Sequence, residues 1–278
     1  MKTYRFGWKP DLPDRRDIPF RRIFRLPAKL PASVDLRNKC SAVEDQGDLG
    51  SCTAQALVGA LEFLEIKNAI NLGVTTEKGF ADLSRLFVYY NERAEEGTVE
   101  WDSGAYIRDG IKVLKKLGVC REDKWPYQTD RLSDKPSAEC YKEGLKHQVT
   151  SYQRLSTLDE MKTCLAMGLP FVGGFTCYNS LMSGEVARTG DVPMPGDNDY
   201  TVGGHAIMFV GYEDAVKRVI FRNSWGEEWG KKGYGTLPYE YLVPDLSDDF
   251  WAIQTIESNQ YCMNMGFVFP VTADQAMA

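Results

Sequence analysis

Histidine is scarce in this chain, with two residues in 278, and the seven cysteines include no Cys-x-x-Cys pair. Structural zinc sites use four Cys or His ligands, usually in closely spaced pairs, so the sequence argues against zinc. Glycine fingerprints of the P-loop or dinucleotide-binding type are missing as well. We therefore expect neither a metal nor a cofactor.

Long apolar runs are also absent. No stretch approaches the ~20 apolar residues of a membrane span. Met1–Trp8 lacks the apolar core of a signal peptide. The net charge of −6 gives no reason to expect nucleic-acid binding. We expect no membrane span, and a monomer that is cytoplasmic or exported without a classical signal peptide.

The remaining composition is that of a folded protein with a large core. Hydrophobic residues make up 43% of the chain and charged residues 26%, values ordinary for a globular protein. A chain of 278 residues has room for one two-lobed domain or for two domains.

The most informative stretch is Gln46–Cys52, which combines a glutamine, two glycines and a cysteine. Apolar residues at three- and four-residue steps predict a helix over Cys52–Lys67, with Ser51 as its N-cap. A thiol in the first turn lies near free backbone N–H groups and the positive end of the helix dipole, which favour a thiolate. The Gln46 side chain could add a second donor for an oxyanion.

A second group of residues lies far along the chain, at His205 and Asn223. The run His205–Tyr212 is predicted to be a strand and Lys217–Asn223 its hairpin partner, which would bring the two residues together. The Asn223 carbonyl could then accept from one ring nitrogen of His205 and fix its tautomer, leaving the other nitrogen to move protons.

Each of these residues has an ordinary alternative role. A buried cysteine, a core histidine, a turn glutamine and a loop asparagine are all common, and the other six cysteines are interpreted as packing or surface thiols. Their combination in this order favours a catalytic site over four independent structural roles.

The order and spacing of Gln46, Cys52, His205 and Asn223 resemble the papain and cathepsin family of cysteine peptidases, from about Leu30 to about Ile256. The resemblance implies that Cys52 is the nucleophile, that His205 carries the proton, that Asn223 orients His205, and that Gln46 binds the oxyanion. It implies an endopeptidase that cleaves peptide or protein substrates through an acyl-enzyme.

The resemblance also implies a set of substrate-binding residues. Ser103 and Gly104 would bind the substrate backbone, and Gly174 would lie near the pocket for the second side chain before the cut. Gly204 precedes the histidine, while Trp225 and Trp229 would border the leaving-group side. A helix cap at Gly104 and a packed aromatic at Trp229 are the alternatives.

Several departures from the family pattern stand out. A family disulfide would join the position of Leu49 to one near Trp101, and another would join a position near Asn91 to Cys140; neither pair of cysteines is complete. Thr53 replaces an aromatic residue and Gly204 a polar one. Two alternatives therefore stay open, a catalytically impaired peptide-binding protein and a transpeptidase or ligase. The missing disulfides favour a bacterial, xylellain-like branch.

Helices first and strands later predict an α+β fold. We expect the papain-like two-lobed form, with a helical lobe over about 40–148, an antiparallel β-rich lobe over about 149–278, and the active site in the cleft between them. The expected helices beyond the first cover 84–95, 104–117 and 157–168. The expected strands cover 171–176, 205–212, 217–223, 233–237 and 250–256.

Residues 1–29 form a basic N-terminal extension before the peptidase domain of residues 30–278. They hold nine Lys or Arg residues and three acidic ones, while the whole chain carries −6. Four prolines favour extended chain over long helices. Our hypothesis is that this extension lies across the acidic body and covers the substrate cleft; the alternative is a solvated basic tail.

Overall fold

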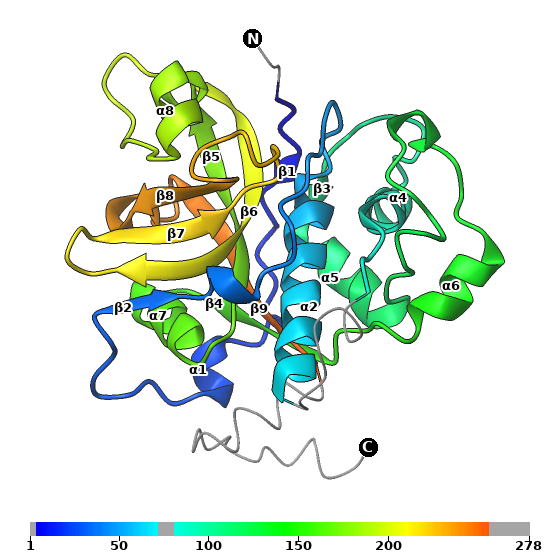
Figure 1. The fold of residues 1–278 in the computed structure, drawn as a ribbon, viewed down its shortest axis with the longest axis horizontal. Coiled ribbons are helices and arrows are strands. Elements are labelled where there is room, and N and C mark those ends of the chain that lie inside the picture. Colours follow the sequence, from blue (N-terminus) through cyan, green and yellow to red (C-terminus); the bar gives the residue numbers. More distant parts are fainter. Residues whose placement is uncertain (1–3, 72–80, 256–278) are drawn as a thin grey trace.

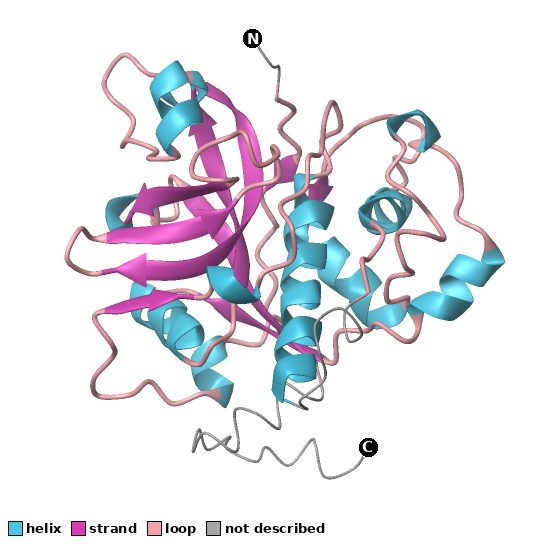
Figure 2. Ribbon diagram, in the orientation of Figure 1, coloured by secondary structure: helices cyan, strands magenta, loops and turns pink. Residues whose placement is uncertain are grey.

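The described part of the chain, residues 4–71 and 81–255 in this computed structural model, has a helical half and a sheet half (Figures 1 and 2). The helical half contains α4 (Arg85–Glu96), α5 (Ile107–Lys116) and α6 (Ala138–Gly144). Helix α2 (Cys52–Asn71) stands between these helices and the sheet, where it contacts α4, α5 and strand β6 (Thr201–Glu213). Because it is covered on both sides, polar residues of α2 such as Thr53 and Glu62 are buried along with the apolar ones.

The sheet half contains one antiparallel sheet with the strand order β4–β9–β5–β6–β7–β8, and β2 also pairs with β6. Helices α1, α7 and α8 accompany it (Figure 1). The bounds of these elements are β2 (Ser33–Asp35), β4 (Ser151–Leu155), β5 (Phe171–Tyr178), β7 (Arg218–Arg222), β8 (Tyr234–Pro238), β9 (Ser247–Gln254), α1 (Phe20–Ile23), α7 (Leu158–Ala166) and α8 (Gly184–Thr189). Short 3-10 turns lie at Arg37–Lys39, Thr129–Arg131, Asn179–Met182 and Tyr239–Tyr241. The predicted α+β, two-lobed architecture is confirmed.

Local sequence signals explain several helix boundaries. The Ser84 hydroxyl accepts from the backbone N–H of Phe87 at 3.1 Å and caps α4, which ends at Gly97 in the left-handed conformation with φ 69°. Thr157 caps α7 in the same way, accepting from the N–H of Glu160 at 3.2 Å. These two residues open the helices expected over 84–95 and 157–168.

Other boundaries differ from the prediction. The helix expected from Gly104 begins at Ile107, because Ala105–Tyr106 forms a short strand, β3, that pairs in parallel with β1 (Trp8–Lys9). The last strand spans Ser247–Gln254 rather than 250–256, and Ile256 lies outside the described residues. Strand β4 and the short helices α1, α6 and α8 were not predicted, because four to seven residues show little periodicity.

The N-terminal residues run between the two halves of the molecule. In Figure 1 the dark blue trace passes between β6 and the upper end of α2, and β1 contacts both β5 and β6. Further along, Phe20 and Phe24 stack with ring centroids 4.5 Å apart and are buried, at 0% and 2% exposure. Asp17, just before these rings in the chain, forms ion pairs with Arg108 of α5 and Arg154 of β4, at 2.7 and 3.2 Å. This part of the chain is thus built into the fold.

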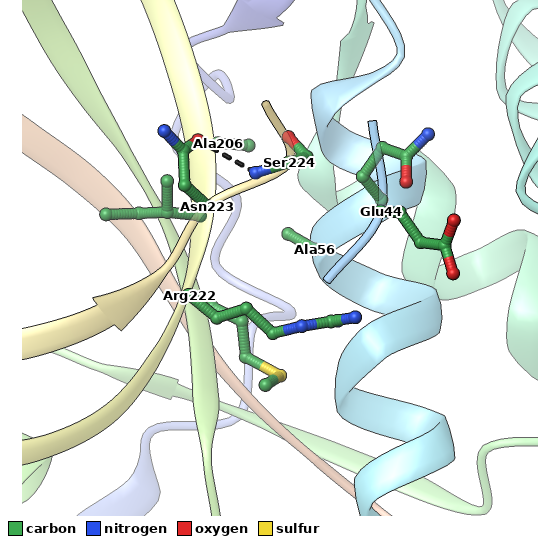
Figure 3. Close-up of a pocket in the computed structure, with 9 residues that line it drawn as sticks. Glu44, Ala56, Ala206, Arg222, Asn223 and Ser224 are labelled. Atoms are coloured by element: carbon green, nitrogen blue, oxygen red, sulfur yellow. Dashed lines mark hydrogen bonds between the residues drawn. The ribbon is translucent and has the colours of Figure 1, made fainter. Parts of the chain in front are cut away.

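The two halves are also joined by Arg222, which extends from the end of β7 toward α2 (Figure 3). Its guanidinium donates to the Ser41 hydroxyl at 3.3 Å and to the Ala42 carbonyl, and it lies where a side chain at Gly59 would be. Six cysteines are free thiols in the described chain, and Cys262 lies outside it. None of the described helices has the length and apolar character needed to cross a membrane.

Candidate active site

Cys52 is the first residue of α2 and is 0% exposed. The backbone N–H groups of Ala206 and Gly7 lie near its sulfur and act to lower the pKa of the thiol. Ala206 belongs to β6 and follows His205, so the start of α2 lies against the strand that carries the histidine. Gly7 comes from the chain's own N-terminus.

His205 and Asn223 meet as the predicted hairpin requires. His205 Nε2 lies 2.8 Å from Asn223 Oδ1, and the same oxygen accepts from the backbone N–H of Ser224 at 2.8 Å (Figure 3). An amide oxygen only accepts, so Nε2 carries the ring proton and Nδ1 is left as the basic nitrogen. Nδ1 is buried without a hydrogen-bond partner among the described residues.

Trp225 covers the histidine ring. The two rings stack with centroids 4.7 Å apart, and Trp229 meets Trp225 edge-on at 5.4 Å. Both tryptophans are 2% exposed, so the His205–Asn223 hydrogen bond is shielded from water. Shielding strengthens that hydrogen bond and holds the ring orientation.

The side chain of Gln46 is oriented by hydrogen bonds on both ends. Its Oε1 accepts from Ser224 Oγ at 2.7 Å. Its Nε2 donates to the carbonyl oxygens of Leu49 and Arg5, at 2.8 and 3.1 Å. The amide donor predicted to bind an oxyanion therefore holds a carbonyl oxygen of the N-terminal segment.

Tyr127, which the sequence analysis did not single out, holds the loop before Cys52. Its hydroxyl donates to the Gln46 carbonyl at 2.9 Å and lies 2.6 Å from Ser51 Oγ. Ser51 stands directly before α2, at the expected N-cap position, and its carbonyl accepts from the backbone N–H of Gln55 at 3.0 Å. Next to Cys52, Thr53 occupies the position of the missing aromatic residue, and its hydroxyl donates to the buried carboxyl of Glu92 at 2.8 Å.

A small cavity behind Asn223 is too small for a peptide. Its volume is about 10 Å³, and it lies between α2, β6 and the end of β7 (Figure 3). Space of this size suits a single water molecule. Residues around it include Glu44, Gln55, Ala56, Arg222, Asn223 and Ser224. Residues 4–9 also lie against the catalytic candidates, where Phe6 meets His205 and Tyr4 stacks on Trp225.

Residues 4–9, here called the covering segment, contact most of the predicted substrate-binding residues. A side chain at Gly104 would overlap the Gly7 carbonyl, one at Gly174 would overlap the Trp8 ring, and one at Gly204 would overlap the Trp8 carbonyl. Tyr4 stacks on Trp225 with centroids 4.1 Å apart. Ser103 bonds to the Gly104 carbonyl at 2.9 Å. Trp229 lies one layer farther out, behind Trp225.

Burial keeps the Cys52 thiol and the His205 ring neutral. It raises the pKa of the Cys52 thiol to about 11, against the lowering effect of the Ala206 and Gly7 N–H groups. It lowers the pKa of His205 to about 4, against the raising effect of Asn223. The thiolate expected from the helix dipole is therefore disfavoured in this covered arrangement.

Two carboxylates beside the site had no recognisable signal in the sequence. Asp102 accepts from the backbone N–H of Gly50 at 3.0 Å, and Asp249 accepts from Trp8 Nε1 at 3.0 Å. Asp102 lies in a loop and Asp249 follows Asp248 near the start of β9, and acidic residues in such places are usually solvated. No group of three or more His, Cys, Asp or Glu residues in the described chain could hold a metal ion.

Comparisons with known proteins show the family to which the chain belongs. The model of the papain family cysteine proteases matches residues 30–241. The structure of xylellain, a cysteine protease from Xylella fastidiosa, is similar with a TM-score of 0.80 and 43% identity, covering 90% of this chain and 96% of that one.

Two curated relatives extend the likeness. A peptidase C1-like protein of Acanthamoeba polyphaga mimivirus is 37% identical, over 90% of this chain and 87% of its own length. Cathepsin K of Gallus gallus is 30% identical over 76% of this chain, and the match spans 59% of that protein. This chain belongs to the papain family of cysteine proteases and is a cysteine peptidase.

Proposed function

We propose that the chain is a cysteine endopeptidase with Cys52, His205 and Asn223 as its catalytic set. His205 Nδ1 takes the proton of the Cys52 thiol, and the thiolate attacks the scissile carbonyl carbon. The oxyanion that forms is held by Gln46 Nε2 and the backbone N–H of Cys52. The histidine proton then passes to the leaving amine, and the acyl group stays on sulfur as a thioester.

Water completes the cycle. His205 removes a proton from the attacking water, the thioester carbon passes through a second oxyanion, and the carboxylic acid leaves as the Cys52 thiol is restored. Asn223 keeps the imidazole in one tautomer and supports the imidazolium through its 2.8 Å hydrogen bond.

The observation that carries this proposal is the hydrogen bond from Gln46 Nε2 to a peptide carbonyl oxygen, at 3.1 Å. The peptide is extended, it adjoins Cys52 through Gly7, and its Phe6 ring meets His205 edge-on at 6.3 Å. A main-chain carbonyl oxygen thus already accepts from the donor proposed for the oxyanion, which supports that role for Gln46.

We further propose that the basic extension, residues 1–29, keeps the peptidase domain of residues 30–278 latent through its covering segment. Trp8 occupies the pocket at Gly174, on the side proposed for residues before the cut. Tyr4 lies on Trp225, on the side proposed for the leaving group. The segment therefore runs opposite to the proposed direction of a substrate, and that polarity opposes its own cleavage.

We also propose that the helical lobe covers about residues 40–148 and the β-rich lobe about residues 149–278.

Neither alternative, an impaired peptide-binding protein or a transpeptidase, is supported by the comparisons, whose named relatives are proteases. The activity test is turnover of a mixed peptide library under reducing conditions, with Cys52→Ser as the matched variant. Internal cuts that vanish in Cys52→Ser are expected; cuts that persist in the variant would rule out Cys52 as nucleophile. An added amine that captures the acyl group would reveal a transpeptidase.

A further inference from the structure

Two loops carry the groups assigned above to the oxyanion and to the substrate backbone. The first, residues 46–51, leads into Cys52. The second, residues 98–104, ends at Gly104, directly before β3, where the backbone N–H of Ala105 donates to the Gly7 carbonyl at 2.8 Å. The relative position of these loops decides whether a bound peptide presents its carbonyl to the thiol.

The carboxylate of Asp102 joins the two loops. The backbone N–H of Gly50 lies 3.0 Å from both Oδ1 and Oδ2 of Asp102. The Tyr89 hydroxyl, from α4, donates to Oδ1, and it accepts in turn from the backbone N–H of Gly104 at 3.0 Å. A continuous hydrogen-bonded chain, here called the Asp102 link, therefore runs through Gly50, Asp102, Tyr89 and Gly104.

Tyr89 is fixed in place for this role. It is 0% exposed, and burial together with the Asp102 carboxylate raises its pKa above the ordinary value, so the hydroxyl stays a donor. The Arg93 guanidinium lies 4.4 Å from the Tyr89 ring centre and donates to the carbonyls of Val99 and Trp101, at 2.8 and 3.3 Å. The second loop is thus anchored to α4 at several points.

The residues just before Gly50 and Asp102 are Leu49 and Trp101, the region where a disulfide usually joins these two loops in the papain family. We propose that Asp102 is a positioning residue that takes over this task, holding the oxyanion donors at Cys52 in register with the substrate-binding backbone at Gly104. The inference rests on the proposed function, because it assumes catalysis at Cys52.

The replacement has a physical consequence. Disulfides persist in oxidising compartments and are lost under reducing conditions. Hydrogen bonds to a carboxylate still join the two loops under reducing conditions. A thiol nucleophile also needs reducing conditions to stay unoxidised. Hydrogen bonds to a charged acceptor are stronger than neutral ones. Loss of the carboxylate would leave the Gly50 N–H without its acceptor and free the two loops to move apart.

The test compares four full-length variants with wild type: Asp102→Ala, Asp102→Asn, Tyr89→Phe, and Glu100→Ala as a control on the exposed face of the same loop. Peptide hydrolysis gives kcat and KM, calorimetry gives Tm, and hydrogen exchange gives the protection of the Gly50 amide. Saturating peptide removes the competing effect of the covering segment from kcat.

Asp102→Ala should lower kcat by about tenfold to a hundredfold, because small misplacements of reacting groups have effects of this size. Asp102→Asn should stay within about threefold of wild type, because its amide oxygen still accepts. Tyr89→Phe should mainly raise KM, since its hydroxyl meets Gly104, and Glu100→Ala should change nothing.

Equal losses in the Ala and Asn variants that follow Tm would overturn the proposal, because they would indicate a structural role alone. If the wild type cuts no peptide, the proposed function fails. The Asp102 link is then tested by hydrogen exchange of the Gly50 amide alone. Asp102→Ala should speed exchange of the Gly50 amide relative to Glu100→Ala; equal protection in the two variants would overturn the link.

Discussion

Gln46 holds the carbonyl oxygen of Arg5, with 3.1 Å between its side-chain Nε2 and that oxygen. The donor proposed for the oxyanion is thereby occupied by the chain's own backbone, at the same place where Cys52 and His205 are fully buried. The covering segment lies against both residues, with Gly7 near the Cys52 sulfur and Phe6 edge-on to His205.

Displacing the covering segment should raise activity. In Gly7→Ala the new methyl group would overlap the Gly50 carbonyl, whose backbone cannot move without the loop before Cys52. We expect hydrolysis by full-length protein to rise by about tenfold or more, the equivalent of weakening the segment by ~1.4 kcal/mol. Alkylation of Cys52 by iodoacetamide should accelerate in parallel.

Gly184→Ala is the matched control, because its side chain would meet nothing within 4 Å. Deletion of all 29 extension residues is a poorer test, since it removes the buried rings of Phe20 and Phe24. Unchanged hydrolysis and alkylation in Gly7→Ala, with an unchanged Tm, would contradict the covering role.

Loss of the Gln46 amide should separate catalysis from binding. Gln46→Ala removes one oxyanion donor, and removal of such a donor typically lowers kcat by about 10²–10³. KM should not rise, because the donor acts mainly on the transition state and its loss also frees the Arg5 carbonyl of the covering segment. The measurement is steady-state hydrolysis beside Gln128→Ala, an exposed glutamine. A large KM effect with normal kcat would instead assign Gln46 to ground-state binding.

The covering segment should also bind less tightly as pH rises. Asp11 follows that segment, and burial, with the nearby charge of Asp249, raises its pKa from 3.8 to about 7. Once released into water, the carboxyl returns to its ordinary pKa, so the docked form holds its proton more strongly. Protonation of Asp11 therefore contributes fully to docking below about pH 4, and this contribution is lost as the pH rises through about 7.

The groups around Asp11 come from four elements. Trp251 and Asp249 of β9 bond to its side chain and backbone, at 3.2 and 2.7 Å, and Arg108 of α5 lies 4.0 Å from it. Arg154 of β4 pairs with Asp249 and Asp248, and Asp17 of the extension pairs with both arginines.

Asp11→Asn, a neutral mimic of the protonated acid, should stay docked at high pH. Wild-type activity divided by that of Asp11→Asn should rise about tenfold or more between about pH 5 and pH 8. Taking this ratio cancels the titration of Cys52 and His205. Asp14→Asn, whose partner is Arg16, is the control. A flat ratio would show that Asp11 does not set the docking.

The sequence could predict elements whose signals are local. The apolar run after His205 and its turn predicted a hairpin, and β6 and β7 place His205 beside Asn223. The caps at Ser84 and Thr157 are equally local. The positions of Trp8 and Asp11 depend instead on contacts with residues more than 200 positions away in the chain, such as the Trp8–Asp249 hydrogen bond. A single side chain shows no periodicity, so these contacts leave no signal in the sequence. Asp102 escaped prediction for the same reason.

The last prediction concerns side-chain preference. Trp8 fills a pocket in which side chains at Gly174 and Gly204 would overlap it, and its indole N–H donates to Asp249 Oδ2 at 3.0 Å. When the segment leaves, that oxygen loses its donors from Trp8 and Asp11, while Oδ1 stays 2.9 Å from Arg154. An unpaired buried acceptor favours any substrate side chain that brings a donor.

Peptides with Trp as the second residue before the cut should therefore have a higher kcat/KM than matched peptides with Phe. The ratio should be about tenfold, as expected for one hydrogen bond to a charged group. Asp249→Ala, which removes the acceptor, should reduce the ratio toward one, whereas Asp248→Ala, which lies beside it and is 44% exposed, should leave it unchanged. Because both peptides are measured on the same enzyme, effects on folding and on the covering segment cancel. Equal Trp and Phe rates on wild type would show that Asp249 does not select the substrate.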